Sequence, residues 1–218
     1  LYKIIRNHNS RSYGDLWTGY RTTDRKANGK VWDMYSDRPN GTPAYEYNFG
    51  SNQCGNYSGE GSCYNREHSW PKSWFNDATV PENDIMHVVP TDGYVNGRRS
   101  NNAFGVVDSP RWTSTNGSKL GTNSYPGAPA TDAFEPIAEY KGDFARIYFY
   151  MSTRYKQEDG SWRATDMTDK AKLKPWAINM LLEWHYNDPV SAKELDRNNA
   201  VYAYQRNRNP FVDRPEFV

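Results

Sequence analysis

Long apolar segments are absent from this chain of 218 residues, whose mean hydropathy is −1.00. A helix that crosses a bilayer needs roughly 20 consecutive apolar residues, so we expect neither a transmembrane segment nor a membrane partner. A recognisable signal peptide is missing too, and the chain begins at Leu1. We therefore expect the processed mature domain of a secreted protein, extracellular or periplasmic.

Cysteine is scarce, with only Cys54 and Cys63 in the sequence. Two cysteines without Cys-x-x-Cys spacing or nearby histidines supply too few ligands for a structural zinc site. They enclose a loop rich in glycine, serine and asparagine just before Asn65. A short-range disulfide is expected if the protein folds in an oxidising compartment, and two free thiols are the alternative for a cytosolic protein.

Neither sign of charge is in excess. The 27 basic and 26 acidic residues leave a formal net charge of +1, which excludes the uniformly basic surface of many nucleic-acid-binding proteins. Any electropositive groove must come from local clusters. Such clusters occur at Arg98 and Arg99, at Lys170, Lys172 and Lys174, and at Arg206 and Arg208.

Internal repeats, coiled-coil heptads, phosphate-binding loops, dinucleotide motifs and interdomain linkers are also missing. What is present is material for one core, because 36% of the residues are hydrophobic and 15% are aromatic. A chain of this length can bury a sizeable core as a single domain. We expect one mixed α+β domain over residues 1–218 that acts as a monomer.

Two segments, residues 65–71 and 84–99, combine the side chains that phosphodiester hydrolysis requires. That reaction needs a base that activates water, a cation that stabilises negative charge, and a clamp for the phosphate anion. The candidates are His68 as the base, Glu67 and Asn96 as the metal ligands, and Arg98 or Arg99 as the clamp.

The candidate ligands are oxygen atoms, which favour a hard cation. One carboxylate and one amide suit a single Mg2+ that keeps several waters, with Mn2+ or Ca2+ as alternatives. A site with two metals would need a cluster of acidic residues, and only Glu67 is adjacent to His68. Asn101 and Asn102 are the alternative amide ligands to Asn96.

These segments resemble the secreted, nonspecific endonuclease I family, whose catalytic core is the ββα-metal, or His-Me, finger. The resemblance rests on motifs that follow one another in order: Glu67 and His68 with Pro71, residues 84–99, Phe134-Glu135-Pro136, residues 145–151 and residues 207–211. It implies a ββα-metal core at about residues 64–102 and the cleavage of double- and single-stranded DNA, and of RNA.

The same resemblance implies the roles of the site residues. His68 is the general base, Glu67 and Asn96 hold the metal, and an arginine stabilises the phosphate, for which Arg99 is the nearest match. Some relatives take this arginine from a longer insertion after the Glu-His pair. Residues 72–83 of this chain are shorter and contain no arginine.

The local sequence predicts two short strands, at residues 66–70 and 85–89, and a helix from an N-cap at Thr91 to Arg99. Gly93 and Gly97 weaken this helix, so packing or the metal must hold it. Asn96 and Arg99 share one face of the helix and are expected to serve the same phosphate. Neighbouring strand residues point to opposite faces, so Glu67 and His68 can meet at one site only where the strand ends or bulges.

Outside this region the patterns predict scaffold. Helices are expected around residues 13–20, at 143–155, from Pro175 and after Pro189, strands at 31–35 and 45–49, and a long loop over 104–131.

Two other functions fit parts of the sequence. A metal-independent ribonuclease would use His68 and His87 as an acid-base pair, although His87 lies in an apolar run where a core histidine is the commoner case. An extracellular binding module for carbohydrate would instead use Trp112, Tyr125 and Trp162 to stack on its ligand, with the Glu-His pair incidental.

Overall fold

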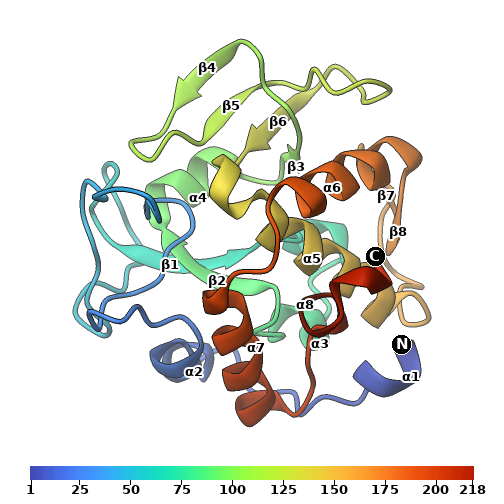
Figure 1. The fold of residues 1–218 in the computed structure, drawn as a ribbon, viewed down its shortest axis with the longest axis horizontal. Helices are drawn as coiled ribbons and strands as arrows, with labels where there is room; N and C mark the ends of the chain where they lie inside the picture. Colours follow the sequence, from blue (N-terminus) through green and yellow to red (C-terminus); the bar gives the residue numbers. More distant parts are fainter.

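Helix α5 (Ala138–Tyr155) runs through the middle of the molecule, and the other elements pack around it (Figure 1). The structure, a computed structural model, describes residues 1–218. One hydrophobic cluster of 36 buried residues joins α5 to the surrounding helices and strands, so the α+β fold is organised around one main core. The other long helices are α2 (Leu16–Thr23), α6 (Pro175–Asn187) and α7 (Ala192–Gln205).

The remaining helical segments, apart from α4 (Gly93–Arg99), have only three or four residues each. They are α1 (Tyr2–Ile5), α3 (Thr79–Glu82), α8 (Pro210–Asp213) and the 3-10 turns η1 (Lys72–Trp74) and η2 (Pro215–Phe217). None of the helices combines the length and the apolar character needed to cross a bilayer.

The strands form three small sheets. Two of them are antiparallel pairs, β1 (Tyr64–His68) with β2 (Val88–Asp92) and β7 (Thr168–Asp169) with β8 (Lys172–Leu173). The third sheet has the order β3-β6-β5-β4, formed by β3 (Ala103–Phe104), β6 (Asp132–Glu135), β5 (Lys119–Thr122) and β4 (Pro110–Thr113). Only β3 and β6 run parallel.

Strands β1 and β2 lead directly into helix α4 (Gly93–Arg99), as the sequence predicted for this part of the chain. Both strands are displaced from the predicted bounds, since β1 covers residues 64–68 and β2 covers 88–92. Pro90 therefore lies inside β2 instead of ending it. Proline is tolerated there because β2 has only one partner strand, so the missing N–H interrupts no second ladder.

The displacement of β2 comes from a turn at Asp84. Its carboxylate accepts a hydrogen bond from the N–H of Met86 at 3.0 Å, and its carbonyl oxygen accepts those of His87 and Val88 at 3.1 Å. The carboxylate also accepts a hydrogen bond from the hydroxyl of Tyr150 in α5. Because these bonds hold the apolar run in a turn, the strand can start only at Val88.

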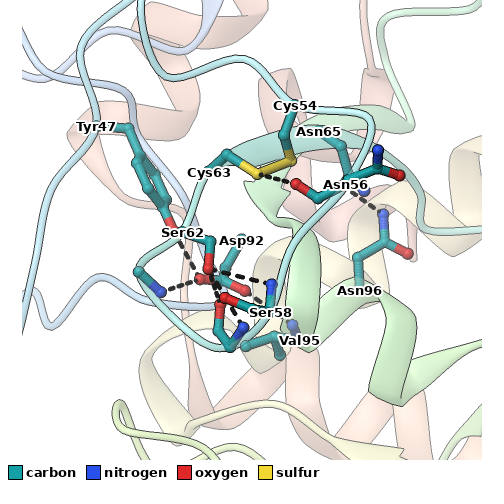
Figure 2. The surroundings of a disulfide bond; sticks show 12 residues. Tyr47, Cys54, Asn56, Ser58, Ser62, Cys63, Asn65, Asp92, Val95 and Asn96 are labelled. Atoms are coloured by element: carbon teal, nitrogen blue, oxygen red, sulfur yellow. Dashed lines mark hydrogen bonds between the residues drawn. A yellow bond between two sulfur atoms is a disulfide. The ribbon is translucent and has the colours of Figure 1, made fainter.

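The predicted disulfide is confirmed between Cys54 and Cys63, whose Cα atoms are 5.3 Å apart (Figure 2). The loop that it closes carries Tyr57 onto α4. A β-carbon at Gly93 would lie 2.8 Å from the Tyr57 ring, and one at Gly97 would collide with the Tyr57 hydroxyl. Helix α4 thus contains two glycines where an aromatic ring packs against it, and this packing offsets their low helix propensity.

The N-terminus of α4 is fixed by Asp92, one residue after the predicted N-cap Thr91. The Asp92 carboxylate accepts the N–H of Val95 at 2.8 Å, and its other oxygen accepts the hydroxyl of Tyr47 at 2.6 Å (Figure 2). This capping hydrogen bond satisfies one of the free N–H groups at the start of the helix. The helix therefore starts with a fixed orientation relative to β2.

The strands predicted at residues 31–35 and 45–49 were wrong, because the chain has no regular strand there. The carboxylate of Asp33 accepts hydrogen bonds from the N–H of Tyr35 at 2.8 Å and the hydroxyl of Ser36 at 2.6 Å. Local bonds from an aspartate side chain compete with strand pairing and favour a turn.

The predicted helices are confirmed, and all but one have altered starts. The helix expected around residues 13–20 is α2, which begins at Leu16. Helix α5 begins at Ala138 instead of residue 143, α6 begins at Pro175 as predicted, and α7 begins after Ser191, which forms a capping box with Glu194. The prediction of a long loop over residues 104–131 was too coarse, since this stretch contains β4 and β5.

Candidate active site

Glu67, His68 and Asn96 line one open pocket of about 260 Å³. The sequence had assigned these three residues to the base and the metal ligands, and the fold brings them together from the end of β1 and the middle of α4. The rest of the lining is polar or small, and consists of Arg66, Pro71, Lys72, Gly97, Ser100 and Asn101. A pocket of this composition suits a charged, hydrated ligand.

Strand β1 ends at His68, which is the irregularity that the sequence required if Glu67 and His68 were to reach one site. The pairing with β2 is regular up to that point, with His68 opposite Val88. The next residue, Ser69, donates its N–H and its hydroxyl to the carbonyl oxygen of His87 at 3.2 and 2.9 Å. The chain leaves the strand there, so both side chains border the pocket.

Glu67 is held by two donors on one of its oxygens. Tyr35 donates its hydroxyl and Arg99 its guanidinium to Oε1, both at 2.8 Å. No protein group hydrogen-bonds Oε2, which is not a buried atom. Burial raises the pKa of Glu67, whereas the charge of Arg99 acts in the opposite direction. The geometry therefore leaves one carboxylate oxygen available to the pocket.

His68 donates its Nε2 hydrogen to the carbonyl oxygen of Glu82, at 3.0 Å. A carbonyl oxygen can only accept, so Nε2 carries the proton and Nδ1 of the neutral ring carries the lone pair. Nδ1 has no protein partner and is not a buried atom. Burial, reinforced by the repulsion that a second positive charge on His87 would add, holds the pKa of His68 well below its ordinary value, so the ring is neutral near pH 7. The tautomer is that of a base.

Asn96 is oriented by its neighbour Asn65. The Nδ2 of Asn96 donates to Oδ1 of Asn65 at 2.8 Å, which leaves Oδ1 of Asn96 as a free acceptor (Figure 2). The structure contains no group of three or more His, Cys, Asp or Glu side chains that could enclose a metal ion. Within the pocket lining, Glu67 supplies the one carboxylate and Asn96 and Asn101 supply the two amides.

Neither predicted phosphate clamp lines the pocket. The Arg99 side chain is 1% exposed and points into the protein, where it also donates to the carbonyl oxygens of His68 and Ser69 at 3.0 and 2.7 Å. Arg98 is exposed but lies against the Tyr94 hydroxyl, at 3.0 Å from Nε. Asn96 and Arg99 are three residues apart, yet one faces the pocket and the other the core, so their expected service to one phosphate is not supported.

Arg66 also lines the pocket, although its sequence position had not suggested a role in the site. Its guanidinium lies 3.5 Å from the ring centre of Tyr13 and 4.6 Å from that of Trp17, and Nη1 donates to the carbonyl oxygen of Tyr13 at 2.8 Å. None of the ion pairs involves Arg66, whereas the other cation in the lining, Lys72, is paired with Glu82 at 2.5 Å. Strand alternation could have revealed it, because residues two apart share a face and Arg66 is two residues before His68.

His87 is a structural histidine. Its side chain is fully buried, and its Nε2 lies 2.6 Å from the carbonyl oxygen of Pro81. The ring centre is 5.6 Å from that of His68, but His87 does not line the pocket. This placement argues against an acid-base pair of two histidines.

The carbohydrate-binding alternative loses one of its three rings. Trp162 is 5% exposed and packs between Trp70 and Tyr155, with ring centres 5.6 and 5.4 Å away. It belongs to the core and cannot stack on a ligand.

The burial of His87 can be tested through the pH dependence of stability. Burial lowers the pKa of His87 to about 4 in the folded protein, against about 6.5 in the unfolded chain. The folded state therefore binds fewer protons, and stability that is present above pH 6.5 is lost as the pH falls towards 4. Between pH 7 and pH 4.5 we expect the free energy of unfolding of the wild type to fall by on the order of 2 kcal/mol more than that of His87→Gln, as measured by urea unfolding at both pH values. If the free energy of unfolding depended on pH equally in the wild type and the variant, the lowered pKa of His87 would be contradicted.

The whole chain is similar to proteins of one known family. The pattern of the endonuclease I family matches residues 1–216. Extracellular ribonucleases of Bacillus amyloliquefaciens and Bacillus subtilis (strain 168) are 36% identical over 231 residues and 35% identical over 228 residues, and each alignment covers 100% of this chain and 71% of the relative. Endonuclease-1 of Buchnera aphidicola subsp. Baizongia pistaciae (strain Bp) is 30% identical over 131 residues, or 60% of this chain and 46% of that protein. As its motifs indicated, the chain belongs to the endonuclease I family.

Proposed function

We propose that this protein is a secreted, metal-dependent endonuclease that hydrolyses phosphodiester bonds in DNA and RNA without reading their sequence. The observation that carries the proposal is one pocket lined by three side chains with free acceptor atoms: Nδ1 of His68, Oε2 of Glu67 and Oδ1 of Asn96. A base beside two hard oxygen ligands is the set of groups that hydrolysis with a single metal requires. On this proposal the β1–β2–α4 unit is the ββα-metal core.

His68 activates the attacking water. Its Nδ1 takes a proton from the water as the water oxygen forms a bond to phosphorus, while the bond from phosphorus to the leaving oxygen breaks. The leaving oxygen then takes a proton from solvent. The hydrogen bond from Nε2 to the Glu82 carbonyl keeps the ring in place and stabilises the positive charge that it gains.

Glu67 and Asn96 fit a hard cation by the chemistry of their free oxygens. Mg2+ accepts one or two protein ligands and keeps several waters, and Mn2+ and Ca2+ also prefer oxygen. A cation held there supplies positive charge for the phosphate and the leaving oxygen. Arg99 and Tyr35 position the Glu67 carboxylate through its other oxygen.

We propose that Arg66, in place of Arg98 or Arg99, binds the substrate phosphate. It borders the pocket and no carboxylate neutralises it. Its contacts with Tyr13 and Trp17 hold the guanidinium while leaving hydrogen-bond donors free. Arg99 becomes a positioning residue, because its donors are already used by Glu67 and by the backbone after β1.

The substrate range and the location outside the cell have separate supports. Two relatives are named extracellular ribonuclease, which supports RNA and secretion, and a third is named Endonuclease-1, which supports cleavage within the nucleic acid chain. The disulfide between Cys54 and Cys63 also suits an oxidising compartment. The pocket addresses phosphate and cation, and such contacts carry no sequence information.

The first test is His68→Ala, which we expect to lower the rate of cleavage of DNA and RNA about a hundredfold to ten-thousandfold, as the loss of a general base typically does. Thermal unfolding should show that the variant still folds. His87→Gln is the matched control, because that ring lies outside the pocket and should retain its activity. Loss of activity in both variants, with both still folded, would favour the two-histidine ribonuclease, and full activity of His68→Ala would remove His68 from the mechanism.

The second test is metal dependence. A chelator should abolish cleavage and added Mg2+ should restore it. Because the site has only two protein ligands, Asn96→Ala should raise the Mg2+ concentration for half-maximal activity roughly tenfold or more. Asn101→Ala, which lines the same pocket, serves as the control. A shift in the control alone would move the amide ligand to Asn101.

The third test concerns Arg66. Arg66→Ala should reduce kcat/KM about tenfold to a hundredfold on DNA and RNA alike, which corresponds to one charged hydrogen bond to the substrate. Arg66→Lys should restore part of the rate, and Arg206→Ala, an exposed arginine at the end of α7, should change little. A loss confined to particular base sequences would instead assign Arg66 to base recognition.

A further inference from the structure

Three aromatic side chains and one arginine gather on the surface beside α4. We call Tyr57, Tyr94, Trp112 and Arg98 the aromatic platform. The ring centres of Tyr57 and Tyr94 are 6.2 Å apart, and those of Tyr94 and Trp112 are 6.3 Å apart. The Arg98 guanidinium lies 5.0 Å from the ring centre of Tyr94 and 5.8 Å from that of Trp112.

The members of the platform come from three separate parts of the chain. Tyr57 is carried by the disulfide loop, Tyr94 and Arg98 by α4, and Trp112 by β4. Tyr57 is 39% exposed and Arg98 is exposed, while the other two rings are half-buried. The rings meet edge to face, with interplanar angles of 87° between Tyr57 and Tyr94 and 64° between Tyr94 and Trp112, and the assembly remains open to solvent.

The platform has a positive charge that the protein leaves unneutralised. Arg98 forms no ion pair, and its side-chain hydrogen bonds go to the hydroxyl of Tyr94. Trp112 rests on the edge of the main core, but Tyr57 and Tyr94 are not part of that core. Packing against Gly93 and Gly97 accounts for the position of Tyr57, whereas stabilisation of the main core does not account for Tyr94 and Arg98.

The platform is continuous with the catalytic pocket. Tyr57 packs with its hydroxyl end against Gly97, and Gly97 itself lines the pocket together with Asn96. Tyr94 and Arg98 are each two residues from Asn96 in α4 and therefore lie on the side of the helix turned away from it, so the platform joins the pocket through Tyr57. A strand that has a phosphate in the pocket and continues past Tyr57 would bring its next bases to the platform.

We propose that the aromatic platform binds unpaired bases of a strand that has a phosphate in the pocket, so that the enzyme prefers single-stranded or unstacked nucleic acid. The inference rests on the proposed function for the position of the phosphate. Bases of single strands stack on aromatic rings and on arginine, and this contact tolerates any base. In a duplex the base faces are covered by their neighbours, so the platform has nothing to stack on.

The experiment is a binding measurement in the presence of chelator, which needs no cleavage. Fluorescence anisotropy with a labelled single-stranded oligonucleotide, the same strand with abasic residues, and the corresponding duplex gives three dissociation constants. Trp112→Ala and Arg98→Ala should each weaken binding of the intact single strand roughly tenfold and leave the duplex nearly unchanged. On the abasic strand the variants should bind like the wild type.

Two matched variants separate stacking from folding. Trp112→Phe keeps a ring and should bind the single strand much as the wild type does. Tyr125→Ala removes a half-buried aromatic from another part of the surface and should have no effect. Equal loss on single strand and duplex, or no loss on either, would overturn the inference.

Failure of the platform and failure of the proposed function give different results. Cleavage of duplex DNA, with Mg2+ present, reports on the pocket without the platform, because the bases of a duplex are stacked on their neighbours. If the wild type cleaves it and the platform variants do not discriminate between single strand and duplex, only the platform is wrong. If the wild type does not cleave it, the proposed function is wrong, and the anisotropy measurement still decides whether the platform binds bases.

Discussion

The buried ion pair between Arg99 and Glu67 is the interaction on which the site depends. Arg99 joins α4 to the end of β1 through Glu67 and the carbonyl oxygens of His68 and Ser69, and reaches α5 through the hydroxyl of Tyr148 at 3.3 Å. Removal of one partner from such a buried pair typically costs about 3 to 5 kcal/mol, because the other charge is left unpaired. The pair thus links the two elements that carry the proposed ligands.

A second constraint acts on α4 from the solvent side. The disulfide between Cys54 and Cys63 closes a short loop, which by chain entropy alone is worth roughly 2 to 3 kcal/mol. The loop places Tyr57 on the two glycines of the helix. Asn96 therefore sits on a short helix that is clamped between a buried arginine and an aromatic ring. A helix of this length would not be stable alone.

The neighbouring histidines His68 and His87 share a buried environment but differ in the accessibility of one ring nitrogen. Burial lowers the pKa of both rings, so both are neutral near pH 7. Each also approaches a backbone carbonyl oxygen through Nε2. They differ in the second nitrogen, since Nδ1 of His87 is buried without a partner whereas that of His68 is not. Only His68 has a lone pair where water and substrate could reach it.

The sequence alone determined the family, the disulfide and the existence of two strands and a helix around the Glu-His pair, because these follow from local motifs and spacing. It did not determine that β2 starts at Val88, that Arg99 faces the core, or that Arg66 borders the pocket. Those outcomes depend on partners distant in the chain: Tyr150 on Asp84, Tyr35 and Tyr148 around Arg99, and Tyr13 with Trp17 around Arg66. A charged side chain is placed by the groups that satisfy it, and only the tertiary structure brings those groups together.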